Sequence, residues 1–371
     1  MMIMGDSLNS HGANRLARIN IDLEAIRHNY RLLKKLSGNK NLIAVIKADA
    51  YGHGATEVAK TLPNADAFAV AAVGEAVALR KAGVTQKIVV LGGYIRNQEL
   101  QTCIEYQLDP VIHQQFHLDH LLNHPDLNDL QVWVKIDSGM GRLGFALDAV
   151  PGVMEQLSLA PTLGQVRMMT HLATADNIEN SFTEQQIDIV KNLELDHYEW
   201  GIANSSGILG WPDAHETWVR AGIAMYGANP MSNRKQDTVD LRPAMQMKTS
   251  ILAVNHHSKG DLIGYNNAYT CSNDMKIAVI AAGYADGYPR HKTATSQVRV
   301  HDQLCDIIGR VSMDMITVDV SALETVNVDD EVILFGTSPD ANDVADWSET
   351  IAYEVLCNVG AHARREYINK D

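Results

Sequence analysis

The stretch Leu42-Ile43-Ala44-Val45-Ile46-Lys47 is a short apolar run that ends in a lysine and leads into Ala48-Asp49-Ala50-Tyr51-Gly52-His53-Gly54. Such a run predicts a buried strand. A lysine at the end of such a strand either extends its ammonium group to water or takes part in a reaction. The glycines let the loop approach an anion closely. This combination favours a lysine that forms a Schiff base beside a bound phosphate.

Seven further apolar runs follow, separated by segments such as 74–82 and 183–193 whose apolar residues recur at helical spacing. Eight strand–helix units predict an α/β fold, a (β/α)8 barrel of the TIM type, with its active site at the C-terminal ends of the strands. The predicted strands are Leu42–Lys47, Ala67–Ala72, Lys87–Gly92, Leu108–Ile112, Val132–Asp137, Val166–His171, Tyr198–Ala203 and Trp218–Ala224.

The sequence pattern changes after residue 244, where short predicted strands follow one another with turns between them. We therefore expect two domains, a barrel over 1–244 and a mainly β domain over 245–371. Residues 17–23 alternate as a strand does and precede the helix-like segment 24–35. We expect this extra strand to join the C-terminal domain. The predicted strands there are Ser250–Val254, Lys276–Ala281, Gln297–Val300, Asp306–Ile308, Met315–Val320 and Glu331–Phe335.

Composition narrows the class of protein. The chain has 371 residues, 46% of them apolar, and a formal charge of −14. That charge argues against nucleic acid or an anionic membrane as the partner. The four cysteines are scattered without metal-like spacing, so we expect buried free thiols and no metal site. Residues 1–14 have no long apolar core, and no transmembrane run occurs elsewhere, so a reducing cytoplasm is expected.

The segment from Ala44 to Gly54 resembles the pyridoxal-phosphate segment of the alanine racemase family. The resemblance extends over nearly the whole chain and implies the same order of two domains. In the family, the lysine binds pyridoxal 5'-phosphate covalently and the tyrosine four residues later contacts its phosphate. The resemblance therefore implies that Lys47 binds the cofactor covalently and that Tyr51 contacts its phosphate.

The ends of the fifth and sixth predicted strands match further family motifs. Asp137-Ser138-Gly139-Met140-Gly141-Arg142-Leu143-Gly144 implies that Arg142 contacts the phenolic oxygen of the cofactor and the substrate carboxylate. Lys135 matches a lysine that many members carry as a carbamate; the alternative is an unmodified lysine in a polar part of the barrel. His171, in Thr170-His171-Leu172-Ala173, resembles the histidine between a cofactor-side arginine and a catalytic tyrosine.

The seventh and eighth predicted strands supply neutral donors and one arginine. Asn204 and Ser205, with the backbone N–H groups of Gly222 and Ile223, suit a bound phosphate. The family match implies that Arg220 faces the pyridine nitrogen. An arginine stays protonated and leaves that nitrogen largely unprotonated, which restrains side reactions such as transamination.

The C-terminal part resembles the family at the second catalytic base. Gly264-Tyr265-Asn266 implies that Tyr265 is this base, although asparagine stands at position 266 where glycine is usual. Three further segments match the family. They imply that Tyr284 and Tyr353 are gate tyrosines and that the backbone amide of Met313 contacts the substrate carboxylate. They also imply a phosphate contact from Tyr353 and a supporting role for Asp314. The chain departs from the usual ending after Tyr353, and we expect this to affect the tail more than the site.

The resemblance implies an alanine racemase that interconverts L- and D-alanine with two bases, Lys47 and Tyr265, which meet across a homodimer. Its D-alanine would supply peptidoglycan or, in a catabolic relative, oxidation. The alternatives are a broad-specificity amino-acid racemase, a barrel–β decarboxylase, and a non-catalytic pyridoxal-phosphate carrier. Arg220 and Tyr265 argue against the decarboxylase, and the second domain argues against the carrier.

Overall fold

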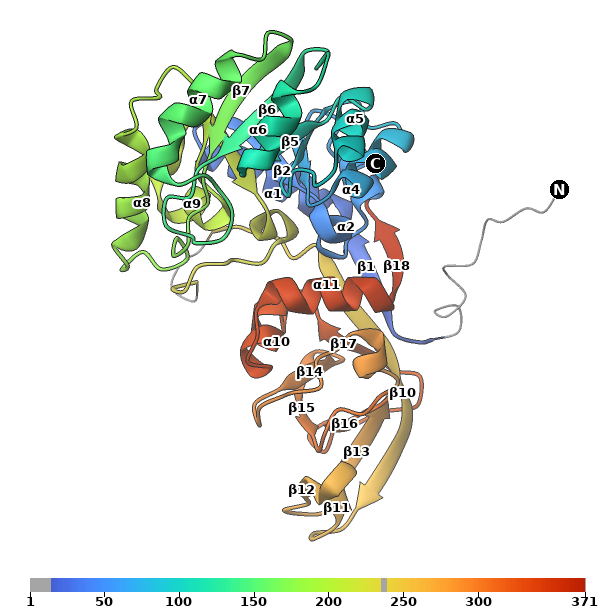
Figure 1. Cartoon of the computed structure of the whole chain (residues 1–371). Helices are drawn as coiled ribbons and strands as arrows, with labels where there is room; N and C mark the ends of the chain where they lie inside the picture. Colours follow the sequence, from blue (N-terminus) through green and yellow to red (C-terminus); the bar gives the residue numbers. More distant parts are fainter. Residues whose placement is uncertain (1–14, 235–238, 371) are drawn as a thin grey trace, which may run out of the picture.

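Eight parallel strands form a closed barrel in the computed structural model, which describes residues 15–234 and 239–370 (Figure 1). The N-terminal segment 1–14, for which the sequence predicted no leader, lies outside the described residues. All eight predicted barrel strands are confirmed. They are β2 (Asn41–Val45), β3 (Ala67–Val70), β4 (Lys87–Val90), β5 (Asp109–Ile112), β6 (Leu130–Lys135), β7 (Leu163–Met169), β8 (Trp200–Gly201) and β9 (Trp218–Ala221).

These strands read as nearly continuous apolar runs because both of their faces are buried, one in the barrel interior and one beneath helices. Local signals fix where several helices begin. Asp22 accepts hydrogen bonds from the backbone N–H groups of Glu24 and Ala25 at the start of α1. The helices are α1 (Leu23–Leu36), α2 (Lys47–Tyr51), α3 (Ala55–Thr61), α4 (Val73–Lys81), α5 (Asn97–Glu105), α6 (Gln115–Leu122), α7 (Val150–Ser158), α8 (Phe182–Lys191) and α9 (Ser205–Gly210).

The C-terminal part contains a second, eight-stranded sheet with the order β13-β16-β15-β14-β17-β10-β1-β18. A two-stranded hairpin lies at the end of this part that is farthest from the barrel (Figure 1). The strands are β10 (Met245–His257), β11 (Leu262–Ile263), β12 (Tyr269–Thr270), β13 (Met275–Ile280), β14 (Gln297–Val300), β15 (Gln303–Ile308), β16 (Ile316–Asp319), β17 (Glu331–Phe335) and β18 (Arg364–Ile368).

Strand β1 (Arg18–Asp22) belongs to this second sheet although it precedes the barrel in sequence (Figure 1). It pairs antiparallel with β10 and parallel with β18. Ile19 and Ile21 are fully buried, and the residues between them are not. This alternation is that of a strand with one buried face.

The C-terminal segment whose sequence departs from the family's ending packs against the loop that follows Lys47. Helix α11 (Ala352–His362) lies between the barrel and the second sheet, after α10 (Ala341–Trp347) (Figure 1). A Cβ at Gly360 would lie 2.3 Å from the Cα of Gly52, so α11 touches the loop after Lys47 directly. Among the described residues, no helix is long and apolar enough to cross a membrane.

Candidate active site at the C-terminal end of the barrel

The loop after Lys47 has an unusual backbone. Ala48, Asp49, Ala50 and Tyr51 all have φ between 52° and 56°, which makes α2 a left-handed turn. L-residues with side chains disfavour this conformation by about 1–2 kcal/mol each, so contacts from elsewhere must hold it. Glu75 accepts a hydrogen bond from the N–H of Ala48 at 2.8 Å. The turn redirects the chain immediately after Lys47.

Lys47 is half-buried and has cationic neighbours. Burial lowers the pKa of its ammonium group, and the positive charges of Arg142 and Arg220 lower it further. A larger fraction of Lys47 is therefore the neutral amine at neutral pH. This is the form that reacts with a carbonyl compound or accepts a proton.

Neutral hydrogen-bond donors gather where β8 and β9 end; we call Tyr51, Ser205, Gly222 and Ile223 the donor cluster. The Ser205 hydroxyl accepts a hydrogen bond from the N–H of Gly222 at 2.9 Å. A Cβ at Gly222 would lie 2.8 Å from the Tyr51 hydroxyl oxygen and 3.7 Å from Ser205 Oγ. Glycine therefore leaves a small space that the hydroxyls of Tyr51 and Ser205 face. Strand β9 pairs with β2, so this space adjoins the strand that leads to Lys47.

Two other tyrosine rings lie close to the ring of Tyr51. The ring centroid of Tyr51 lies 5.0 Å from that of Tyr226 and 5.9 Å from that of Tyr353, which α11 supplies. Burial raises the pKa of Tyr353 to about 12, so its hydroxyl stays protonated and can donate. The structure thus brings Tyr51 and Tyr353 together within one chain. Asn204 caps α9 by accepting from the N–H of Gly207 and lies beside the donor cluster without belonging to it.

Arg220 lies inside the barrel and is held by backbone carbonyls. Its guanidinium donates to the carbonyl oxygens of Gly201, Thr170 and Ile202 at 2.5, 2.7 and 3.1 Å. Burial lowers its pKa to about 10, which leaves it charged at neutral pH. Burial, together with Arg220 and three other cationic groups, lowers the pKa of His171 to about 3. The site therefore combines a fixed cation with a neutral imidazole.

Arg142 is presented by the turn that follows β6. Asp137 accepts hydrogen bonds from the N–H groups of Gly139 and Gly141 at 3.0 Å and so shapes this turn. Gly144 is required here because a Cβ would lie 2.5 Å from the nitrogen of Asp137. Lys135, at the end of β6, has its pKa lowered to about 8 by burial and by Arg220 and Arg142. Lys47, Lys135, Arg142, His171 and Arg220 thus lie close enough to influence one another electrostatically.

The predicted second base, Tyr265, does not lie beside Lys47 within this chain. Tyr265 is 71% exposed between β11 and β12, at the end farthest from the barrel (Figure 1). Tyr284 and Met313 are also exposed, and Asp314 forms an ion pair with Arg15 at 2.9 Å.

Asn266 has φ 59° and ψ 25°, a left-handed conformation. Glycine adopts this conformation freely, and asparagine tolerates it better than most residues do. The departure from the family pattern at position 266 therefore keeps the turn that carries Tyr265.

Two family models match the chain in sequence order. The model described as "Alanine racemase, N-terminal domain" matches residues 21–230, and "Alanine racemase, C-terminal domain" matches residues 244–367. Together they cover nearly all of the chain. The chain belongs to the alanine racemase family.

Curated and solved relatives agree with this assignment. An alanine racemase of Hahella chejuensis is 38% identical over 369 residues and covers 96% of this chain and 99% of its own. The biosynthetic alanine racemase of Pseudomonas aeruginosa is 36% identical with a TM-score of 0.90, over 95% of this chain and 99% of that chain. The Bartonella henselae alanine racemase, solved with covalently bound pyridoxal phosphate, is 26% identical with a TM-score of 0.86, over 95% and 99%.

Several residues of this alanine racemase fold were quoted in motifs but not singled out from the sequence. The Asp49 carboxylate accepts a hydrogen bond from the N–H of Ala55 at 2.7 Å and forms an ion pair with Arg365 at 2.5 Å. Cys357 is half-buried and acts electrostatically on Lys47, whereas the other three cysteines are buried. The role of Glu75 could not be predicted from the sequence. Its carboxylate accepts a hydrogen bond from the N–H of Ala48 only because α4 packs beside the turn.

Proposed function

We propose that this protein is an alanine racemase that uses pyridoxal 5'-phosphate. The observation that carries the proposal is the donor cluster beside Lys47. A space that a Cβ at Gly222 would fill is faced by the hydroxyls of Tyr51 and Ser205. It suits a phosphate held by neutral donors. The half-buried amine of Lys47 on the adjacent strand suits covalent attachment of the same molecule.

When bound, pyridoxal phosphate withdraws electrons from the α-carbon of alanine and makes its proton easier to remove. Lys47 is the base on one face of the substrate and acts on the α-proton of D-alanine. Burial and the nearby arginines lower its pKa, which favours the neutral amine relative to an exposed lysine. Arg142 binds the substrate carboxylate together with the N–H of Met313. Tyr353 adds a hydroxyl to the phosphate site.

The second base is Tyr265 of the partner subunit, acting on the α-proton of L-alanine. Racemisation requires an acid–base group on each face of a planar carbon, and Lys47 supplies only one. Tyr265 is 71% exposed and lies far from the barrel of its own chain (Figure 1). A head-to-tail homodimer would place it over the partner's barrel, with Tyr284 and Asp314 nearby.

Arg220 and His171 prepare this tyrosine and the cofactor ring. Arg220 supplies positive charge, because it stays protonated while buried. His171 supplies a hydrogen bond and no charge, since its pKa lies near 3. We also infer that Lys135 carries a carbamate. Its pKa of about 8 leaves neutral amine to react with carbon dioxide, and the resulting anion would face Arg142 and Arg220.

We further propose that the chain divides at residue 244 and acts in the cytoplasm, where its four free cysteines stay reduced. The product D-alanine would serve peptidoglycan synthesis or, if the role is catabolic, oxidation.

Racemisation by the purified protein tests the function. The cofactor-loaded protein should interconvert L- and D-alanine, which circular dichroism measures. Serine and lysine are assayed separately for comparison. Lys47→Ala should abolish turnover. Turnover of alanine by Lys47→Ala at the wild-type rate, or no turnover by loaded wild type, would refute the proposal; equal rates on all three substrates would indicate a broad-specificity racemase.

A further inference from the structure

The left-handed turn after Lys47 is in contact with the last strand of the chain. Arg365, in β18, forms an ion pair with the Asp49 carboxylate at 2.5 Å, and Asp49 is two residues from Lys47. The other carboxylate oxygen of Asp49 accepts from the N–H of Ala55 at 2.7 Å. One aspartate thus links the middle of the turn to the start of α3 and to β18.

Tyr367 contacts the end of the same turn. It lies two residues after Arg365, on the same face of β18. A Cβ at Gly54 would lie 2.9 Å from Nη1 of Arg365, and would overlap the Tyr367 hydroxyl. The segment from Asp49 to Gly54 is therefore packed against two neighbouring side chains of one strand.

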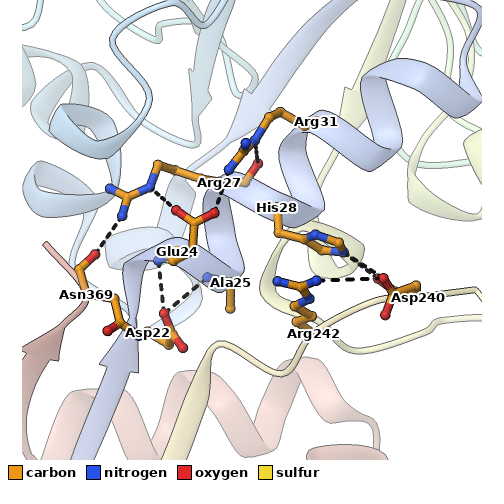
Figure 2. A network of polar contacts seen from close by, with 9 residues as sticks. All are labelled: Asp22, Glu24, Ala25, Arg27, His28, Arg31, Asp240, Arg242 and Asn369. Atoms are coloured by element: carbon orange, nitrogen blue, oxygen red, sulfur yellow. Dashed lines mark hydrogen bonds and ion pairs between the residues drawn. The ribbon is translucent and has the colours of Figure 1, made fainter. Parts of the chain in front are cut away.

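Strand β18 is itself fixed on its other side. It pairs in parallel with β1, with Ile19 opposite Arg365. Beyond the strand, Arg27 of α1 donates to the carbonyl oxygen of Asn369 at 2.7 Å (Figure 2). The backbone of β18, which carries Arg365, is thus held by β1 and α1, which do not belong to the loop that Arg365 contacts.

We propose that Arg365 is a positioning residue for Lys47, which it keeps in place by holding Asp49 and with it the left-handed turn. The inference rests on the proposed function, because it takes Lys47 to be the reacting amine. The ion pair is partly exposed, with Arg365 27% and Asp49 51% accessible. Exposed pairs contribute little to overall stability. The expected effect is therefore on the rate of reaction and not on folding.

Two variants that break the pair differently test this. Arg365→Met removes the charge and keeps the length of the side chain. Asp49→Asn removes the opposite charge and keeps an oxygen for the N–H of Ala55. Arg364→Met is the matched control, because Arg364 is the exposed neighbour on the other face of β18 and contacts Glu366 at 3.7 Å.

Both test variants should lower kcat by about 10- to 100-fold, as expected for a displaced reacting group. The KM for alanine should change little, because the substrate contacts assigned above lie elsewhere. The double variant should be no worse than either single one, and Arg365→Lys should recover much of the loss. Thermal midpoints should match that of Arg364→Met.

A second readout does not depend on turnover. Hydrogen–deuterium exchange of the 46–54 segment in the cofactor-free protein should be faster in Arg365→Met and Asp49→Asn than in wild type and Arg364→Met. If kcat and exchange in both test variants equal those of the control, the inference is overturned while the proposed function stands. If loaded wild type does not racemise alanine, the proposed function fails, and equal exchange rates would then refute the hold of Arg365 on the turn.

Discussion

Ser205 Oγ accepts a hydrogen bond from the backbone N–H of Gly222 at 2.9 Å. The bond joins the loop after β8 to the loop after β9, two adjacent strands of the barrel. It fixes the serine hydroxyl beside the small space at Gly222, which the Tyr51 hydroxyl also faces. The donor cluster is thus already assembled in the protein alone, which agrees with a binding site that is largely pre-formed.

Gly222→Ala should weaken binding of pyridoxal phosphate by about 10- to 100-fold, the range expected for a lost hydrogen bond to a charged group. The added Cβ would lie 2.8 Å from the Tyr51 hydroxyl oxygen, so one of the two must shift. Fluorescence titration of the cofactor-free protein measures this. Pyridoxal without phosphate should lose much less affinity. Gly74→Ala, whose Cβ meets nothing within 4 Å, should bind normally; equal losses for both ligands would rule out a phosphate site.

Subunit exchange should restore activity between two inactive proteins. Lys47→Ala and Tyr265→Ala each destroy both sites of their own dimer, whereas a hybrid dimer keeps one site with both bases. Random mixing should therefore recover about a quarter of wild-type activity, since half of the dimers are hybrids. Distinct tags allow the hybrids to be isolated. Isolated hybrids without activity would disprove the shared site.

Arg220→Glu should shift the reaction from racemisation toward transamination. A carboxylate can share a proton with the pyridine nitrogen, which Arg220 cannot do. The ratio of transamination to racemisation should rise by about tenfold or more, the order expected for changing a preorganised charge. Pyridoxamine phosphate formation measures it. Arg220→Lys keeps the positive charge and should not raise the ratio; an unchanged ratio in Arg220→Glu would contradict the assigned role.

His53 should make the protein less stable in acid. It is fully buried, and burial lowers its pKa from 6.5 to about 4. Between these values the unfolded state binds more protons, so stability falls as pH falls below 6.5 and levels off below 4. The fall in the free energy of unfolding between pH 7 and pH 5 should be about 2 kcal/mol from this residue.

Urea unfolding of the cofactor-free protein at fixed concentration, in wild type and His53→Gln, measures this effect. The variant should lose less stability over the same pH interval, whatever its stability at pH 7. His117 and His171 also have lowered pKa values and leave a remaining pH dependence in both proteins. Identical pH dependence in the two proteins would show that His53 titrates normally.

The barrel could be predicted because its strands carry their signal locally. Each is an apolar run buried on both faces, as in Ala67–Val70. Strand β8 is shorter than predicted, Trp200–Gly201 in place of 198–203. The carbonyl of Ile202 accepts from the side chain of Arg220 there. The motif residues Lys47, Lys135, Arg142, His171 and Arg220 lie near one another because parallel strands bring their C-terminal ends together.

Other features had no local signal. Strand β18, Arg-Arg-Glu-Tyr-Ile, lacks an apolar alternation and forms because β1 pairs with it. Helices α10 and α11 were not predicted in a region that is mainly β. The left-handed turn at Ala48–Tyr51 consists of residues that avoid this conformation locally, and distant side chains hold it.

Because β1 belongs to the second sheet, it cannot pair until strands much later in the chain have been synthesised. The ribosome releases β1 first, yet both strands that pair with it, β10 and β18, follow the entire barrel. At roughly 5–20 residues per second, Ile19 and Ile21 wait for tens of seconds without a partner strand. During this time the nascent chain exposes an unpaired apolar edge, which is where association between chains begins. Chaperone binding to β1 should therefore outlast closure of the barrel and end once β10 and β18 have been synthesised.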